Sequence, residues 1–380
     1  MTLSLLDRAF YLLDSARSPQ DFTVIFDLRD APGVEGFNAG ARSAMNRFPT
    51  SAAWRENGDF KLEISESESA IETFINERFD LRREPPVKQL LVLNGSPARL
   101  ATRFHHAAAD GLSAALWLGH QLNVAYGIET PLIERGQFNG LTLRQSSRSV
   151  RRSQFAFDGA SDALRTSHSK RSGTRRWSTI SFPSFQKFCR RAGGFTYHDL
   201  LATCTLEVLK HWNHKNCKIG LWVPVNVRRE SREGFGNGTS RIRVYASYDD
   251  GISLVEKCRA VRRQVAWSTK HGEWVVPEDR WFARLPDSIA RPLLRRYLQL
   301  PNVDMGTAVF THVANVGEAF KHVERIECVG LLHTRQNLAI NAATHAGHTW
   351  LTFTYDPALL TADDIKQLTQ LYLEQIAQAS

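Results

Sequence analysis

The sequence has few sulfur-containing residues and no long apolar run. Its 380 residues include five cysteines and three methionines, and no two cysteines form a Cys-X-X-Cys pair. An odd number of widely spaced thiols is a poor disulfide framework, so we expect a protein of the reducing cytoplasm. No run of about 18 apolar residues occurs, which argues against a membrane-spanning helix. The N-terminal residues lack a basic leader and include Asp7, Arg8 and Asp14, so no secretion signal is expected.

Internal repeats are also absent, which excludes solenoids and propellers. Hydrophobic residues make up 42% of the chain and charged residues 23%. These are ordinary values for a globular protein and exclude collagen, coiled coils and general disorder. Because 380 residues exceed what one hydrophobic core usually supports, we expect two lobes.

Positive charge is in excess, with 48 Lys and Arg against 39 Asp and Glu and a net charge of +9. This permits phosphate-bearing partners such as coenzyme A, a carrier protein, nucleic acid or an anionic membrane surface. A basic, serine-rich stretch at 141–176 predicts a linker between an N-terminal lobe at 1–140 and a C-terminal lobe at 177–380. Its cations form either an anion-binding rim or, more commonly, a solvated loop. They are Arg144, Arg148, Arg151, Arg152, Arg165, Lys170, Arg171, Arg175 and Arg176.

Hydrophobic patterns predict a mixture of strands and helices, which indicates an α/β or α+β fold. Asp110 is placed to cap a helix at 111–126, and two later helices begin with capping-box sequences. These boxes are Thr196 with Asp199, and Thr361 with Asp364. The predicted strands are residues 87–93, 98–104, 218–228, 239–248, 338–344 and 349–355, the first two joined as a hairpin.

The most informative residues are His105, His106, Asp110 and Gly111, at a predicted strand-to-helix junction. In extended backbone the two histidines point to opposite faces, which argues against joint binding of a metal ion. A neutral imidazole accepts a proton near neutral pH, so either histidine is a candidate general base. The alternative is a buried structural histidine, and Asp110 is either a helix cap or the partner of an arginine.

Two other clusters carry weaker signals. His211, His214 and Cys217 are ligand-type residues without a fourth partner, so we expect no metal site. Arg241 and Arg243 share one face of a predicted strand and contact either a phosphate or, more commonly, solvent.

The segment HHAAADG resembles the HHxxxDG signature of the CoA-dependent acyltransferase superfamily. This superfamily includes chloramphenicol acetyltransferase, condensation domains of nonribosomal peptide synthesis and wax ester synthase-like enzymes. Upstream, LSLLDRAFYLLD resembles the wax ester synthase-like opening, and FDLRREPPVKQLLV resembles the approach to the histidine motif. Downstream, VPVNVRRESREGFGNGTS and THVANVGE resemble the arginine segment and the SNxxG segment. The DFGWG sequence of the plant branch is absent.

The resemblance implies two chloramphenicol acetyltransferase-like lobes in a V-shaped pseudo-dimer with a central tunnel. Within it His106 would be the general base, with His105 beside it in the catalytic motif. Asp110 would pair with Arg228 and hold the histidine loop. Gly111 would let a substrate approach the helix start, where an N–H stabilises an oxyanion; the alternative is a tight turn.

Three further residues are candidate substrate contacts. Gly236 and Asn237 belong to a Gly-Asn-Gly turn, and turn chemistry alone also explains them. Asn315 contacts substrate or orders its own loop.

The predicted function is acyl transfer from an acyl-CoA or acyl-carrier-protein thioester to a small alcohol, giving an ester in lipid or secondary metabolite biosynthesis. An amine acceptor, giving an amide, is the alternative within the same class. No bound cofactor is expected, because CoA or pantetheine enters as part of the substrate. A basic nucleic-acid-binding protein is the alternative from another class, supported only by net charge and the arginine-rich linker. Contact with a membrane surface is compatible with the sequence.

Overall fold

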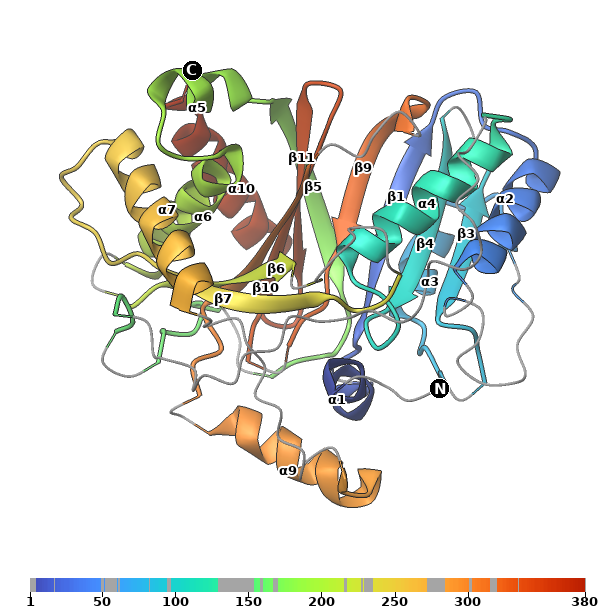
Figure 1. Cartoon of the computed structure of the whole chain (residues 1–380), viewed down its shortest axis with the longest axis horizontal. Helices are drawn as coiled ribbons and strands as arrows, with labels where there is room; N and C mark the ends of the chain where they lie inside the picture. The colour runs from blue at the N-terminus through green and yellow to red at the C-terminus, as the bar shows by residue number, and fades with distance from the viewer. Residues whose placement is uncertain are drawn as a thin grey trace.

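Two β-sheets with flanking helices make up the computed structural model (Figure 1). The first sheet has the strand order β2-β3-β4-β1-β9, and the second has the order β5-β11-β10-β8-β6-β7. This mixture of sheets and helices confirms the predicted fold class. The structure describes residues 5–16, 18–48, 51, 60, 62–81, 83–93, 97–128, 154–157, 160–166, 170–214, 217–226, 228, 235–271, 284–300, 303–314, 320–333 and 335–379.

The first sheet carries the histidine motif on a central strand. Its strands are β1 (Asp21–Leu28), β2 (Leu62–Ser65), β3 (Val87–Val92), β4 (Ala98–His105) and β9 (Val323–Val329). One face packs against α2 (Val34–Arg47) and α4 (Gly111–Ala125), and the other packs against α3 (Ser69–Asn76). The two faces arise because side chains alternate along each strand: Phe26 and Phe104 belong to the first core, whereas Ile25 and Ala101 belong to the second.

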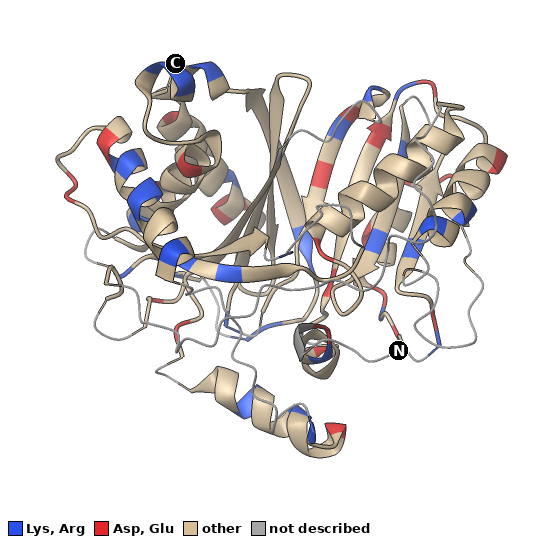
Figure 2. Cartoon of the chain, viewed as in Figure 1, with Lys and Arg blue, Asp and Glu red and all other residues tan. Residues whose placement is uncertain are grey.

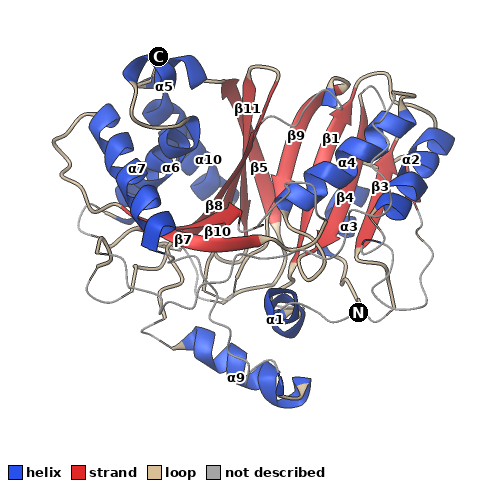
Figure 3. Ribbon diagram, in the orientation of Figure 1, coloured by secondary structure: helices blue, strands red, loops and turns tan. Residues whose placement is uncertain are grey.

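The second sheet has its helices on the side away from the first sheet (Figures 1 and 3). Its core is formed by the apolar face of α6 together with side chains of the strands and of α10. The strands are β5 (Arg176–Pro183), β6 (Gly220–Asn226), β7 (Thr239–Tyr245), β8 (Ala308–Ala314), β10 (Leu338–His345) and β11 (His348–Tyr355). The helices are α5 (Gln186–Ala192), α6 (Tyr197–Asn213), α7 (Leu254–His271) and α10 (Ala362–Ala377).

The two sheets meet at β9. This strand comes from the predicted C-terminal lobe, yet it pairs antiparallel with β1 at the edge of the first sheet. Its backbone also reaches β11 of the second sheet: Cys328 N donates to Thr352 Oγ1 at 3.1 Å, and Gly330 N donates to Thr354 Oγ1 at 2.9 Å. The segment 323–330 therefore connects the lobes.

Two helices lie at the lower edge of Figure 1, away from both layers of helices. They are α1 (Leu5–Leu13) and α9 (Asp287–Gln299), and Arg8 of the first bonds Asp287 of the second at 2.8 Å. In the part of the chain that the structure describes, no helix is long and apolar enough to cross a membrane.

The elements predicted from the sequence are confirmed to within a few residues. Asp110 caps α4 by accepting a hydrogen bond from Ser113 N. Complete capping boxes begin α6 at Thr196 and α10 at Thr361, as their sequences predicted. Local hydrogen-bond chemistry therefore defines where these three helices begin.

Two described arginines of the linker, Arg171 and Arg175, correct the expectation of a solvated loop, whereas Arg165, Lys170 and Arg176 are exposed as expected. Arg175 is neither an anion-binding rim nor solvated, because its side chain is fully buried among groups of the first lobe. Arg171 donates to the carbonyl oxygens of Leu332 and Gln336 and lies 3.9 Å from Asp356. These two cations hold protein segments together. Arg144, Arg148, Arg151 and Arg152 lie outside the described residues.

Candidate active site

The end of β4 separates the two histidines as strand geometry requires. His105 is the last residue of the strand and faces the α3 side of the first sheet, where it is fully buried. His106 follows it on the opposite side, beside Phe22 and Phe10. The prediction that the pair cannot jointly bind a metal ion agrees with this arrangement.

His106 is a half-buried imidazole held by aromatic rings. Its ring lies parallel to Phe10 of α1 at 4.7 Å and tilted against Phe22 of β1 at 4.7 Å. Its backbone N donates to Gln20 O at 2.8 Å, and its Nδ1 is buried without a hydrogen-bond partner among the described residues. Burial lowers the pKa of His106 to about 4, although the charge of Asp110 acts in the opposite direction. At pH 7 this side chain is therefore a neutral base.

His105 has a different environment from that of its neighbour. Its Nδ1 accepts a hydrogen bond from Ala107 N at 3.1 Å, and its Nε2 lies 3.7 Å from Asp14 Oδ1. His105 has no exposed surface. It shapes the turn that carries His106, because its oxygen accepts from Ala108 N and Ala109 N, and its place among the catalytic residues stays a prediction.

Asp110 uses both carboxylate oxygens within the protein. Oδ1 accepts from Ser113 N at 2.9 Å and from Arg228 Nη2 at 2.7 Å. Oδ2 accepts from Gly238 N at 2.9 Å and from Thr239 Oγ1 at 2.6 Å. Burial raises the pKa of Asp110, but the charge and hydrogen bonds of Arg228 outweigh it and the pKa is lowered. The carboxylate is therefore ionised, saturated with donors and closed to substrate.

Arg228 extends the same network into the second lobe. Its Nη2 also donates to Ser113 Oγ and to Gly236 O, each at 3.0 Å. Gly238 lies directly beneath this side chain, since a Cβ at that position would come within 2.5 Å of Arg228 Cγ. The residue must be glycine for the arginine to lie flat against the chain.

Gly236 and Asn237 belong to this junction and are more than a turn. Gly236 has φ of 141°, which favours glycine, and its N donates to Ser113 Oγ at 2.9 Å. Asn237 is buried, and its Nδ2 donates to His106 O at 2.9 Å. The second lobe thus holds the backbone of the histidine itself.

Gly111 has no packing reason to be glycine. It is the first residue of α4, its φ is not in the left-handed region, and an added Cβ would only reach ordinary contact, 3.9 Å from Val313 Cγ2. The tight-turn alternative is therefore not supported. There is room for one methyl group at this position beside the N-terminus of α4. Asn315, the other candidate substrate contact, lies outside the described residues.

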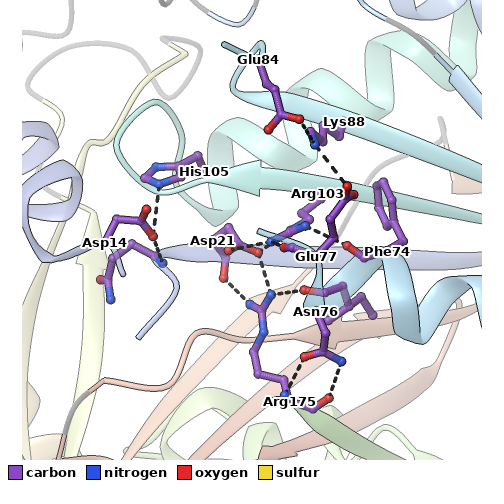
Figure 4. A network of polar contacts seen from close by, with 12 residues as sticks. Asp14, Asp21, Phe74, Asn76, Glu77, Glu84, Lys88, Arg103, His105 and Arg175 are labelled. Carbon is purple, nitrogen blue, oxygen red and sulfur yellow. Dashed lines mark hydrogen bonds and ion pairs between the residues drawn. The ribbon is translucent and has the colours of Figure 1, made fainter. Parts of the chain in front are cut away.

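A buried charge network lies on the His105 side of the sheet (Figure 4). Asp21, paired in register with His105, binds two arginines: Arg103 Nε at 2.6 Å and Arg175 Nη2 at 2.8 Å. Burial opposes ionisation of Asp21, but the two guanidinium groups hold its pKa far below the usual range. Arg103 also donates to the carbonyl oxygen of Phe74 at 2.8 Å. The network ties α3, β1, β4 and the start of β5 together.

Sequence reasoning missed this network and the rings around His106. Phe10 belongs to a segment noted only for its resemblance, and Arg175 was placed in a linker. No local pattern relates either residue to the histidine motif. The contacts depend on the pairing of β1 with β4 and on the docking of α1, both of which are tertiary.

No family model matches the sequence, and no curated protein matches it either. Solved structures do match its fold. The first condensation domain of the calcium-dependent antibiotic synthetase superposes with a TM-score of 0.69 at 13% identity, covering 99% of this chain and 96% of that one. The starter condensation domain of rhizomide synthetase, solved with C8-CoA and Leu-SNAC, gives 0.70 at 12% identity over 100% and 94%. Trichothecene 15-O-acetyltransferase from Fusarium sporotrichioides gives 0.65 at 11% identity over 98% and 94%.

These likenesses define the class at the level of fold. The chain has the two-lobed fold that condensation domains share with this acetyltransferase. The resemblance of its motifs to the CoA-dependent acyltransferase superfamily agrees with that fold.

Proposed function

We propose that the protein is an acyltransferase in which His106 is the general base. The observation that carries this proposal is the state of that side chain: a neutral, half-buried imidazole at the junction of the lobes, fixed by two rings and by bonds to its backbone. With Nδ1 enclosed, Nε2 is the nitrogen left to meet a substrate. General-base catalysis of this kind contributes about 10² to 10⁴ in rate.

The proposed step joins a thioester and an alcohol. The acceptor oxygen attacks the thioester carbonyl carbon while His106 Nε2 takes the hydroxyl proton. The tetrahedral intermediate bears negative charge on the former carbonyl oxygen. When it collapses, the carbon–oxygen double bond re-forms, the carbon–sulfur bond breaks and the thiolate takes the proton from His106. The products are an ester and a free thiol.

Two neighbours support this step without reacting. Asp110, saturated by four donors, holds the start of α4 and so fixes the loop that carries His106. Gly111 leaves space at the positive end of α4, where backbone N–H groups would stabilise the oxyanion. The oxyanion role for Gly111 therefore agrees with the room that its missing side chain provides.

The donor is acyl-CoA or an acyl group on a carrier-protein pantetheine, and the acceptor is a small alcohol. An ester rather than an amide is favoured by the LSLLDRAF opening and the PVNVR segment. No metal or redox cofactor enters the proposed step.

The test is thiol release from a panel of acyl-CoAs and acyl-N-acetylcysteamine thioesters with pooled alcohols and amines. Wild type should release thiol only when an acceptor is present, and His106→Ala should lose about 10² to 10⁴ of the rate. His120→Ala is the matched control, because His120 is another half-buried histidine, held by Ser43 Oγ at 2.9 Å on α4 away from the motif. Unchanged release by His106→Ala would contradict the proposal, as would no release together with a salt-sensitive gel shift on nucleic acid.

For contact with a membrane, α9 is the surface that we propose. The helix α9 exposes three apolar side chains at helical spacing, Ile289 (48%), Leu293 (46%) and Tyr297 (54%), and the exposed Leu300 (40%) follows it directly. Arginines outnumber acids on the same helix, whose acidic residue lies at its start (Figure 2). Arg296 is exposed on this helix, whereas Arg291 and Arg295 contact the α1 segment. An apolar stripe on a helix with an exposed cation suits the surface of an anionic bilayer.

A further inference from the structure

Arg241 has no carboxylate partner, unlike other arginines near the junction of the lobes. Arg228 binds Asp110 at 2.7 Å, and Arg243, two residues along β7, lies 4.0 Å from Asp304. No acid and no hydrogen-bond acceptor engages the Arg241 guanidinium among the residues that the structure describes. Its N–H donors are therefore available.

The guanidinium is held in place by Trp222 of β6. Arg241 Cζ lies over the indole, 3.8 Å from its centroid, in a cation–π contact. Trp222 is itself buried, and its Nε1 donates to Asp304 O at 3.2 Å. A guanidinium held over a ring in this way still has five N–H donors, and two of them can bind an oxyanion together.

Arg241 is accessible to solvent and yet surrounded by protein. The side chain is exposed, but burial by the protein around it, with the like charge of Arg243, lowers the pKa of Arg241 to about 10. Tyr297 of α9 acts on the same group in the opposite direction. The guanidinium is thus open to a solute and has no opposite charge beside it among the described residues, and an oxyanion would supply that charge.

His333 connects this position to the candidate active site. Its ring lies edge-on to Trp222 at 5.5 Å, and burial together with the nearby Arg241 lowers the pKa of His333 to about 3. The adjacent Leu332 O accepts from Ser18 Oγ at 3.3 Å, in the segment whose Gln20 O binds the backbone of His106. The free arginine and the proposed general base therefore flank one short stretch of chain.

We propose that Arg241, stacked on Trp222, binds an anionic group, a carboxylate or a phosphate, on one of the two substrates that react at His106. This assignment rests on the acyl-transfer function proposed above. The anion comes either from a phosphate of the CoA donor or from a carboxylate of the acceptor, since a guanidinium edge fits both.

The experiment compares wild type, Arg241→Gln and Arg241→Lys, with Arg243→Gln as a matched control from the same strand face. Binding is measured by calorimetry with CoA and with pantetheine, which has the same thiol arm without the nucleotide phosphates. Thiol release is then measured with hydroxy acids and with their uncharged methyl esters. Thermal denaturation confirms that each variant is folded.

If the anion is a CoA phosphate, Arg241→Gln weakens CoA binding about 10- to 100-fold and leaves pantetheine unchanged. If it is an acceptor carboxylate, CoA binds as before, and KM for hydroxy acids rises by a similar factor while that for methyl esters does not. Arg241→Lys falls between wild type and Arg241→Gln, and Arg243→Gln stays within about twofold of wild type, far below the loss of a charged hydrogen bond.

Two results would overturn the assignment: wild type binding no anionic probe, or Arg241→Gln matching wild type with every probe. The calorimetric arm needs no turnover. Arg241-dependent binding of CoA without thiol release would therefore retain the anion site and remove the acyltransferase proposal.

Discussion

The burial of the His106 imidazole lowers the pH at which this side chain becomes protonated. Burial lowers its pKa to about 4 from an ordinary value near 6.5. The side chain consequently stays unprotonated as the pH falls, until it approaches that lowered value. Burial therefore keeps the imidazole unprotonated near neutral pH and also makes it a weaker base.

We expect the acid limb of kcat/KM against pH to lie near 4 rather than near 6.5. The free enzyme would be fully in its basic form at pH 6, so the rate should be flat from about pH 8 to 5. The measurement is a pH–rate profile with a thioester substrate, bracketed by circular dichroism to show that the fold persists. An acid limb at pH 6 to 7 would show that His106 is not enclosed as described.

The carboxylate of Asp110 is buried and bonded to groups of both lobes. Replacing it with Asn leaves Arg228 charged, buried and unpaired, so Asp110→Asn should cost about 3 to 5 kcal/mol of unfolding free energy. The control is Asp287→Asn, which removes the exposed pair with Arg8 and should cost about 0 to 1 kcal/mol. Chemical denaturation measures both. Equal losses would mean that the buried pair is no more important than a surface one.

Two glycines near the motif are expected to respond oppositely to alanine. Gly238→Ala places a Cβ 2.5 Å from Arg228 Cγ, so the arginine must move and stability should fall by about 2 kcal/mol or more. Gly111→Ala meets nothing closer than 3.9 Å, so stability should be retained or rise slightly. If Gly111 serves substrate approach, the alanine variant keeps its Tm and loses kcat/KM. Thermal denaturation with an activity assay separates these outcomes.

Features of the helices and strands could be predicted from the sequence where they depend on interactions between residues close together in the chain. The helix starts at Asp110, Thr196 and Thr361 were predictable because each side chain bonds a backbone N–H only three residues away. The pair between Asp110 and Arg228 was expected from the resemblance alone, since nothing local relates residues 118 positions apart. The buried triad of Asp21, Arg103 and Arg175 was not predicted, because it forms only after three distant segments have packed.

The position of helix α1 explains the burial of the His106 ring, which the motif in its sequence did not predict. It places Phe10 on the His106 ring and Tyr11 near Phe79, so this short helix covers the proposed base. Its place is fixed by α9, where Arg295 Nη2 donates to Asp14 O at 3.1 Å. The electrostatic state of the histidine thus depends on an element far from it in sequence.

Phe10→Ala should raise the pKa of His106 from about 4 towards its ordinary value, because removing the ring admits water. The acid limb of the rate profile should move to higher pH. Tyr11→Ala is the control, since it also removes a half-buried ring from α1 but one that does not stack on the histidine. Both variants should lose stability, and only Phe10→Ala should move the acid limb. A profile unchanged in Phe10→Ala would contradict the explanation by burial.

Among the described residues, large exposed apolar side chains are concentrated on and directly after one helix. Four of the six large apolar side chains that are exposed among the described residues belong to α9 or follow it directly, and the other two are Ile64 and Leu93. Because α9 lies at the edge of the molecule (Figure 1), a flat surface could reach it without meeting either sheet.

We expect co-sedimentation with vesicles containing phosphatidylglycerol, and less with phosphatidylcholine alone, because the helix that bears the apolar stripe also exposes Arg296. Leu293→Asp should reduce the bound fraction severalfold. Ile64→Asp, at an equally exposed apolar position on β2 (53%), is the matched control and should bind as wild type does. Equal loss in both variants, or no binding by wild type, would contradict this role for α9; capture of an acidic carrier protein instead would assign the stripe to a protein partner.

The pairing of β9 with β1 delays completion of the first sheet during co-translational folding. On the ribosome, β1 through β4 emerge early, but β1 keeps one edge of unpaired N–H and C=O groups until residues 323–329 follow. The side chain of Arg175, which neutralises Asp21, likewise arrives late. The first lobe therefore cannot finish folding when only residues 1–140 have been translated, because β9 and Arg175 are still missing. Until β9 arrives, this unpaired edge is open to aggregation and is a place where a chaperone would help.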